Sequence, residues 1–265
     1  MSTQLYGSGF SSEKHWKYRA EGDQHHTSNK KKLKLRGREL LSLPSEIFRQ
    51  EELQVLDMSP ERESCLTYRI NKVPREIGQL RNLVVLIMDT NELQQIPPEV
   101  GALENLQKLT LSNNCLSLLP QEFVRLQKLH SLHLANNHFQ ELPEHVCQLR
   151  NLLFLDVSDN KIKLIPQSIQ NLQKLQTLLL FHNRLQHLPR SLCKLKNLCT
   201  LWLGNNNLKS LPHNFGDLSR LDWGCSQCSS NFDGNPLENP PSDVCQGGPA
   251  HIKHYFAMKE TGSAY

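Results

Sequence analysis

One short sequence pattern recurs along most of this 265-residue chain with a fixed spacing of 23 residues. Six units follow one another without gaps from residue 83 to residue 220, each with Asn at its ninth position, Pro at its fifteenth and Leu at its twenty-first. The asparagines are Asn91, Asn114, Asn137, Asn160, Asn183 and Asn206. A period of this length is typical of stacked repeats, in which one unit cannot bury its own apolar residues. The period therefore constrains the fold more than composition does.

The stretch LLFLDVSDNKIKLIP, residues 152–166, shows how one unit is expected to fold. Apolar residues alternate with others from Leu153 to Ser158, which predicts a short strand with one buried and one exposed set of side chains. Asn160 suits the turn that follows, because its side chain bonds readily to nearby backbone groups. Pro166 prevents a regular helix on the returning half and favours a tight turn or a short 3₁₀ segment.

These positions resemble the leucine-rich repeat, specifically the 23-residue intracellular class of Ras-suppressor and Scribble-like proteins. The resemblance covers roughly residues 30–256. It implies an α/β repeat solenoid, a leucine-rich repeat horseshoe with a concave parallel β-sheet and a convex side of short 3₁₀ or irregular segments. It also implies that the six asparagines, together with Asn235, form a structural ladder of side-chain hydrogen bonds along the stack.

The predicted organisation has three parts. Residues 1–29 form a disordered polar and basic tail, residues 30–249 a solenoid of about nine units, and residues 250–265 a capping helix and tail. About seven extra residues within SPERESCLTYR (59–69) are predicted to loop out on the side facing away from the strands. The pattern breaks again at LDWGCSQCSS (221–230) and resumes around Asn235. The helical spacing of Ile252, Tyr255 and Phe256 predicts that they cover the last core layer.

The net charge of +4 is concentrated at the N-terminus. Residues 1–32 hold six Lys/Arg against three Asp/Glu, giving +3, which does not resemble the folded basic face of a nucleic-acid-binding protein. The run KKKLKLRGR (30–38) is compatible with a nuclear address, an anionic-lipid contact or a solvated first repeat, and we prefer the last. With no apolar leader and no apolar run long enough for a bilayer, we expect a monomeric cytoplasmic protein without a transmembrane segment, with the nucleus as an alternative.

Few residues suggest catalysis, disulfide bonding or metal binding. Cys147, Cys193 and Cys245 recur at one equivalent repeat position, which indicates buried packing residues more than disulfides. The motif CSQC (225–228) could form a Cys₂His₂ site with His251 and His254, but an inserted loop is the preferred interpretation because a second ligand pair is missing. The chain carries no G-x-S-x-G, H-E-x-x-H or phosphate-binding glycine motif. We therefore expect no catalytic residues, no metal and no cofactor.

The third, fifth, seventh and eighth positions of each unit are predicted to line the concave sheet. On three adjacent units these positions gather aromatic and apolar side chains, which is typical of binding hot spots. The predicted partner-binding residues are Phe154, Asp156, Leu179, Phe181, His182 and Trp202. Trp223 is a possible extension of this set, and Asp156, Asp159 and Asp89 could orient a basic partner segment. The alternative is that the rings pack on one another without a partner.

We therefore expect a non-enzymatic protein–protein interaction module or scaffold that binds partners on its concave face. The resemblance implies a signalling partner such as a small GTPase, a phosphatase or a polarity and scaffold protein, and nothing in the chain selects among them. Two alternatives stay open. One is the substrate-recognition part of a ubiquitin ligase, suggested by the PP…VC…G ending at residues 240–247. The other is a cytoskeletal or membrane-associated structural scaffold, with Lys30–Arg38 as its anchor.

Overall fold

The computed structural model describes residues 31–35, 45–60, 69–223 and 230–262. They belong to two compact units, an N-terminal unit at Met1–Leu129 and a C-terminal unit at His130–Tyr265, and each is described by itself. The predicted tail at 1–29 and the CSQC motif lie outside the described residues.

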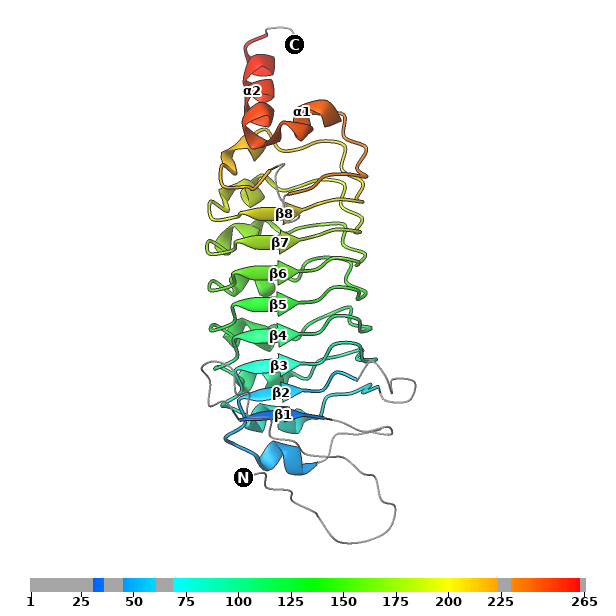
Figure 1. The fold of residues 1–265 in the computed structure, drawn as a ribbon, viewed down its shortest axis with the longest axis vertical. Coiled ribbons are helices and arrows are strands. Elements are labelled where there is room, and N and C mark those ends of the chain that lie inside the picture. Colours follow the sequence, from blue (N-terminus) through cyan, green and yellow to red (C-terminus); the bar gives the residue numbers. More distant parts are fainter. Residues whose placement is uncertain (1–30, 36–44, 61–68, 224–229, 263–265) are drawn as a thin grey trace, which may run out of the picture. The chain divides into compact units, whose positions relative to one another are not determined.

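The N-terminal unit contains four parallel strands in chain order (Figure 1). They are β1 (Lys32–Lys34), β2 (Val55–Asp57), β3 (Val85–Ile87) and β4 (Lys108–Thr110). Equivalent repeat positions pair in register, so that Leu33 lies opposite Leu56, Leu56 opposite Leu86, and Leu86 opposite Leu109. Each strand is followed by a 3₁₀ segment: η1 (Ser45–Arg49), η2 (Arg75–Gln79), η3 (Pro98–Ala102) and η4 (Gln121–Arg125).

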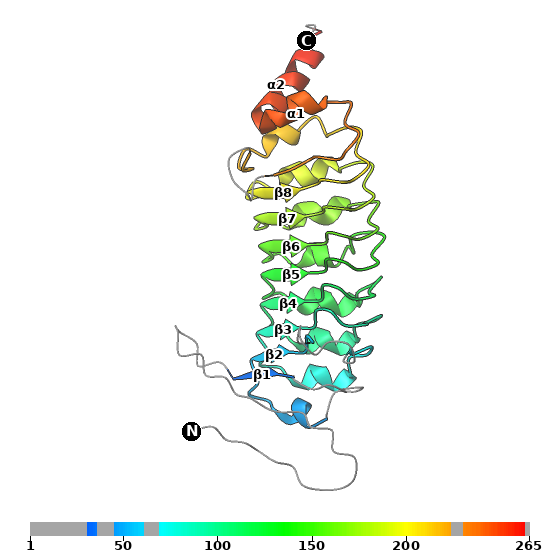
Figure 2. The same ribbon diagram turned by 45° about the vertical axis from the view of Figure 1, so that its right-hand side comes forward.

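The C-terminal unit repeats this arrangement and adds two helices. Its strands are β5 (Ser131–His133), β6 (Phe154–Asp156), β7 (Thr177–Leu179) and β8 (Thr200–Trp202). Its 3₁₀ segments are η5 (Val146–Gln148), η6 (Gln167–Asn171), η7 (Arg190–Lys194) and η8 (Phe215–Asp217), followed by α1 (Ser242–Gln246) and α2 (Gly248–Glu260). Within this unit the 3₁₀ segments lie on the opposite side of each repeat from the strands (Figure 2).

The core of each unit lies between its strands and its 3₁₀ segments. The central leucine of every strand is fully buried, and the apolar residues of the returning half, such as Ile162, Ile169 and Leu172, are buried too. Each buried leucine or isoleucine stabilises the fold by roughly 1.5–3 kcal/mol relative to an exposed one. The leucines that mark the repeat are therefore structural.

The prolines at the fifteenth position directly precede the 3₁₀ segments η3, η4, η6 and η7, whereas η5 and η8 begin three residues after theirs. Pro166 has φ −70° and ψ 154° directly before η6, and its carbonyl accepts a hydrogen bond from the Ile169 amide at 3.1 Å. Pro189 makes the equivalent bond with Leu192 at 3.0 Å. Proline fits here because this residue needs an extended backbone and no amide donor.

The ninth-position asparagines connect consecutive turns. The Asn183 side-chain oxygen accepts a hydrogen bond from the Ile162 amide at 2.9 Å, and its side-chain nitrogen donates to the Val157 carbonyl at 3.0 Å, both in the preceding repeat. Asn91, Asn114, Asn160, Asn206 and Asn235 make the same pair of bonds to the repeat before them, and Asn137 bonds to the carbonyls of Leu134 and Ala135. The six regular asparagines are all less than 9% exposed.

The strands are shorter than the sequence alternation suggested. Each contains only the third to fifth positions of the repeat, so the seventh and eighth positions lie in the turn that follows. Every eighth-position residue of the six regular units has a left-handed backbone with φ between 51° and 59°. Asn, Asp and His tolerate this conformation, whereas a β-branched residue such as Thr90 does so at a cost.

The helices close the carboxyl end of the C-terminal unit. After β8 the backbone continues the parallel ladder at Asn231, which bridges to Trp202. Ile252 and Phe256 of α2 are buried, and Tyr255 is half-buried with its hydroxyl bonded to the Asn239 side chain at 3.1 Å. None of the helices in the described part of the chain has the length and apolar character needed to cross a membrane.

Candidate functional site

The residues that we predicted to bind a partner all lie on the strand face of the C-terminal unit. We use strand face for the outward side chains at the third and fifth strand positions and the turn residues at the seventh and eighth. In-register pairing places Asp156 next to Leu179 and Leu179 next to Trp202, one on each of three adjacent strands. Neighbouring strands are about 4.8 Å apart, so this row is about 10 Å long.

Phe154 stands two residues before Asp156 on β6, and its side chain therefore points to the same side of the sheet. Its ring stacks on His133 of the preceding strand, with ring centroids 4.7 Å apart. The ring is half-buried. This contact is therefore part of the ring-on-ring packing that we gave as the alternative to partner binding.

Phe181 and His182 lie in the turn after β7 and stack on each other with centroids 4.1 Å apart. The Phe181 ring covers Gly204 of the next repeat, where a Cβ atom would lie 3.0 Å from the ring. His182 has φ 51°, and its Nδ1 lies 2.9 Å from a carboxylate oxygen of Asp159. Glycine at position 204 thus lets the Phe181 ring lie flat against the neighbouring turn.

The six predicted residues are consequently brought together on three consecutive repeats. Leu179, Phe181 and Trp202 are half-buried rather than fully exposed, and His182 is exposed. Because neighbouring turns and strands hold them through backbone hydrogen bonds, such as that from His182 to the Gly204 carbonyl at 3.0 Å, they form a rigid apolar surface.

Trp223 does not extend this surface. Its indole nitrogen donates a hydrogen bond to the Gln246 carbonyl at 2.8 Å, and its ring packs on Phe232 with centroids 5.1 Å apart. It also lies against the backbone of Gly248 at the start of α2. The expectation for Trp223 was wrong because its side chain packs against the two closing helices. The residues in this contact are more than twenty positions apart in the sequence.

Ser131 and His133 form a hydrogen-bonded pair, with 2.8 Å between the hydroxyl oxygen and Nε2. Asp156, which is in register with His133 on the next strand, accepts a hydrogen bond from the Ser158 amide at 3.0 Å. Among the described residues no group of three His, Cys, Asp or Glu is arranged to hold a metal ion.

The three cysteines at the equivalent repeat position are free and buried. Burial raises the pKa of the Cys147 thiol to about 11, that of Cys193 to about 12 and that of Cys245 to about 11. A thiol that stays protonated at neutral pH is a poor nucleophile and a poor metal ligand. These cysteines therefore serve as packing residues.

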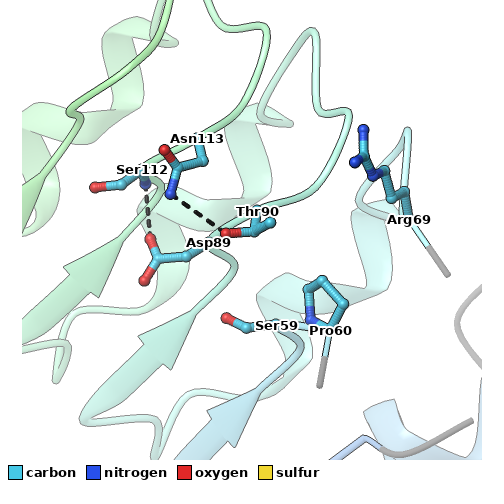
Figure 3. A pocket seen from close by; sticks show the side chains of 7 residues that line it. All are labelled: Ser59, Pro60, Arg69, Asp89, Thr90, Ser112 and Asn113. Atoms are coloured by element: carbon cyan, nitrogen blue, oxygen red, sulfur yellow. Dashed lines mark hydrogen bonds between the residues drawn. The ribbon is translucent and has the colours of Figure 1, made fainter. Parts of the chain in front are cut away.

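Sequence reasoning did not predict the hollow that lies in the N-terminal unit (Figure 3). It has a volume of about 360 Å³ and is lined at the carboxyl ends of β2–β4 by Ser59, Pro60, Arg69, Asp89, Thr90, Ser112 and Asn113. Asp89 accepts a hydrogen bond from the Ser112 amide at 2.7 Å, and Arg69 pairs with Glu92 at 3.2 Å.

Ser59, Pro60 and Arg69 are also the two ends of the predicted inserted loop. Ser59 and Pro60 directly follow β2, and Ile70 resumes the repeat by donating its amide to the Asn91 side chain. The predicted side of the inserted loop stays a prediction. Residues 61–68 lie outside the described part of the chain.

Comparison with family models identifies a leucine-rich repeat region at residues 98–181 and 144–230, which together span half of the chain. The chain belongs to the leucine-rich repeat family. Members typically serve as non-enzymatic interaction modules that present an extended surface to protein partners. The predicted α/β repeat solenoid is confirmed, whereas the narrower Ras-suppressor and Scribble-like class stays a prediction.

Solved leucine-rich repeat structures resemble this chain. A leucine-rich repeat protein of Leptospira interrogans is 35% identical with a TM-score of 0.69, and the match covers 77% of this chain and 49% of that one. The plant peptide hormone receptor RGFR1 in complex with RGF2 is 27% identical with a TM-score of 0.60, covering 74% of this chain and 30% of the receptor.

The ectodomain of the Arabidopsis thaliana membrane receptor kinase GASSHO1/SCHENGEN3, in complex with CASPARIAN STRIP INTEGRITY FACTOR 2, is 29% identical with a TM-score of 0.61. That match covers 75% of this leucine-rich repeat chain and 25% of the ectodomain. This chain therefore spans half or less of the length of these three structures. A search of curated proteins found no match.

Proposed function

We propose that this leucine-rich repeat protein binds a protein partner on the strand face of its C-terminal unit, as a non-enzymatic interaction module or scaffold. The observation that carries the proposal is the cluster of Phe154, Leu179, Phe181 and Trp202 on three consecutive repeats. Rigid aromatic side chains contribute strongly to interfaces because few rotatable bonds are fixed on binding.

The surroundings of the cluster support partner binding over the alternative that the rings only pack on one another. Phe154, Leu179 and Trp202 point outward from three-residue strands whose central leucines already fill the core, and Phe181 lies in the turn after β7. The Phe181 ring rests on Gly204 and the stacked His182, so it is held in place before any partner arrives. A preformed surface of this kind binds with little ordering cost.

The structural relatives support the same class of function. RGFR1 and GASSHO1/SCHENGEN3 were both solved in complex with a bound factor. They match this chain at under 30% identity, so the identity of their partners does not transfer. A small GTPase, a phosphatase or a scaffold protein as the partner, and a cytoplasmic location, stay predictions from the sequence.

The test is affinity capture from cell lysate with the wild-type protein, the Phe181→Ala/Trp202→Ala variant and a Leu164→Ala control. Leu164 is 63% exposed in the same unit but lies away from the strand face, so its removal matches the loss of apolar surface without touching the cluster. All three proteins are first shown to unfold at similar temperatures.

We expect wild type and control to retain the same partners and the double variant to lose them. Truncating a hot-spot aromatic costs about 2 kcal/mol or more, or about 30-fold in affinity. If the double variant retains the same partners as wild type, the strand-face cluster is not the binding site.

A further inference from the structure

The strand face of the C-terminal unit is acidic as well as aromatic. At the third, fifth, seventh and eighth positions of its described repeats, the strand face contains no Lys or Arg. The same positions contain three acidic residues: Asp156, Asp159 and Asp233. The N-terminal unit differs, because its strand face carries Lys32, Lys34 and Lys108.

Hydrogen bonding distinguishes the carboxylates from one another. Asp159 is bonded to His182 at 2.9 Å, and Asp233 accepts a hydrogen bond from the Asn231 side chain at 3.1 Å. In the N-terminal unit Asp57 forms an ion pair with Lys34 at 3.0 Å, and Asp89 accepts from the Ser112 amide. Asp57 and Asp159 thus pair with a basic side chain, and Asp89 and Asp233 each bond to a neighbouring residue.

Asp156 has no basic partner among the described residues, and it lies beside the aromatic cluster. One of its oxygens accepts the Ser158 amide at 3.0 Å, which fixes the orientation of the side chain. The described residues provide no partner for its second oxygen. Asp156 is half-buried and lies beside Leu179 in the strand register, so a cation bound there would be partly shielded from water.

We propose that the partner segment carries an arginine that binds Asp156 next to an apolar side chain that contacts Phe181 and Trp202. The inference rests on the proposed function. The guanidinium would donate to the open oxygen of Asp156, and its aliphatic stem would lie over Leu179 on the neighbouring strand. Arginine fits better than lysine because its flat, weakly hydrated head forms directional bonds to carboxylates and stacks on aromatic rings such as Phe154.

The test uses three sets of immobilised random peptides about twelve residues long, which is enough to cross three repeats. All sets contain Leu, Phe, Ser and Gly, and they differ only in containing Arg, Gln or Glu in addition. The proteins compared are wild type, Asp156→Asn, Phe181→Ala/Trp202→Ala, and Glu144→Gln. Asparagine keeps an oxygen for the Ser158 amide, and Glu144→Gln removes the same charge from an exposed site next to η5, on the other side of the repeat.

We expect wild type and Glu144→Gln to retain the Arg set above the Gln set and the Gln set above the Glu set. Asp156→Asn should lower retention of the Arg set by about 3- to 10-fold and leave the Gln set unchanged. Added salt should weaken the wild-type preference for the Arg set more than that of Asp156→Asn.

The other outcomes separate the two proposals. If Asp156→Asn retains the Arg set as well as wild type does, while the aromatic double variant loses all sets, the arginine inference fails and the proposed function stands. Preferential retention of the Glu set also overturns the arginine inference. If wild type retains none of the three sets, both proposals are contradicted.

Discussion

Among single residues, the ninth-position asparagines join consecutive repeats most directly. Asn206 is 5% exposed, accepts a hydrogen bond from the Leu185 amide at 3.0 Å, and donates to the carbonyls of Leu180 and Leu203 at 2.9 and 3.0 Å. Leu180 and Leu185 belong to the preceding repeat. One side chain thus satisfies backbone groups that are buried where one turn stacks on another.

Replacing Asn206 with alanine should destabilise the protein by about 2–4 kcal/mol, because a buried amide and two carbonyls lose their partner together. Asn207→Ala, one residue later and exposed, should change the free energy of unfolding by less than about 0.5 kcal/mol. Chemical denaturation measures both. Equal effects from the two variants would contradict a role of the ladder in stability.

The eighth-position turn residues, which have a left-handed backbone, lead to a second prediction about single residues. Thr90 adopts φ 59°, whereas the equivalent residues of the other regular units are Asn, Asp or His. Thr90→Asn should therefore stabilise the protein by about 0.5–1 kcal/mol, because the β-branched side chain is strained in this conformation. The same change at Thr177, on the extended strand β7, should destabilise it. Thermal unfolding of the two variants should shift in opposite directions.

At the scale of elements, the junction between η8 and α2 closes the C-terminal unit. A Cβ atom at Gly216 would lie 2.4 Å from the Lys253 Cβ and 2.7 Å from the Pro249 carbonyl oxygen, so the helix approaches the 3₁₀ segment as closely as the backbone permits. Lys253 also pairs with Asp217 at 3.2 Å, and Ile252 and Phe256 are buried. Close backbone packing, more than the ion pair, holds α2 in place.

Gly216→Ala should therefore displace α2 and cost about 1–3 kcal/mol, the usual penalty for overpacking. Lys253→Ala removes only the exposed ion pair and should cost less than about 1 kcal/mol. Hydrogen exchange of the α2 amides should quicken strongly in the first variant and little in the second. Unchanged exchange in Gly216→Ala would show that the junction is looser than the contact distances indicate.

At the scale of the whole molecule, the buried thiols make stability depend on alkaline pH. An unfolded cysteine ionises near pH 8.5, whereas burial raises the pKa of Cys147 and Cys245 to about 11 and that of Cys193 to about 12. Above pH 8.5 the unfolded chain loses protons that the folded protein keeps. The free energy of unfolding therefore falls as pH rises from about 8.5 toward the folded-state pKa values.

The slope should approach about 1.4 kcal/mol per pH unit for each thiol. Replacing all three cysteines with alanine should lower stability at neutral pH through lost packing, yet make its decline between pH 8.5 and 10 shallower. Denaturant unfolding across this pH range measures both effects. Lysine and tyrosine titrate in both proteins, so the difference between the two curves reports the thiols. Parallel curves would mean that the thiols ionise in the folded state as readily as in the unfolded chain.

The sequence alone predicted the features that each repeat encodes locally. The 23-residue spacing predicted short parallel strands with buried central leucines, and Pro166 and its equivalents predicted tight turns or 3₁₀ segments on the returning half. It also placed Phe154, Leu179 and Trp202 on one outward face. These predictions held because every unit meets a neighbour with the same pattern, so the local pattern and the packing agree.

The tertiary structure decided the features that depend on contacts between different repeats or with the closing helices. Trp223 packs against Gln246 and Gly248 instead of joining the aromatic cluster. Asp159 has a basic partner, His182 of the next repeat, whereas Asp156 bonds only to the Ser158 amide among the described residues. Such contacts depend on which side chains of different repeats lie next to each other in the stack. The sequence of a single repeat cannot specify them, because the contacting residues are about 23 positions or more apart.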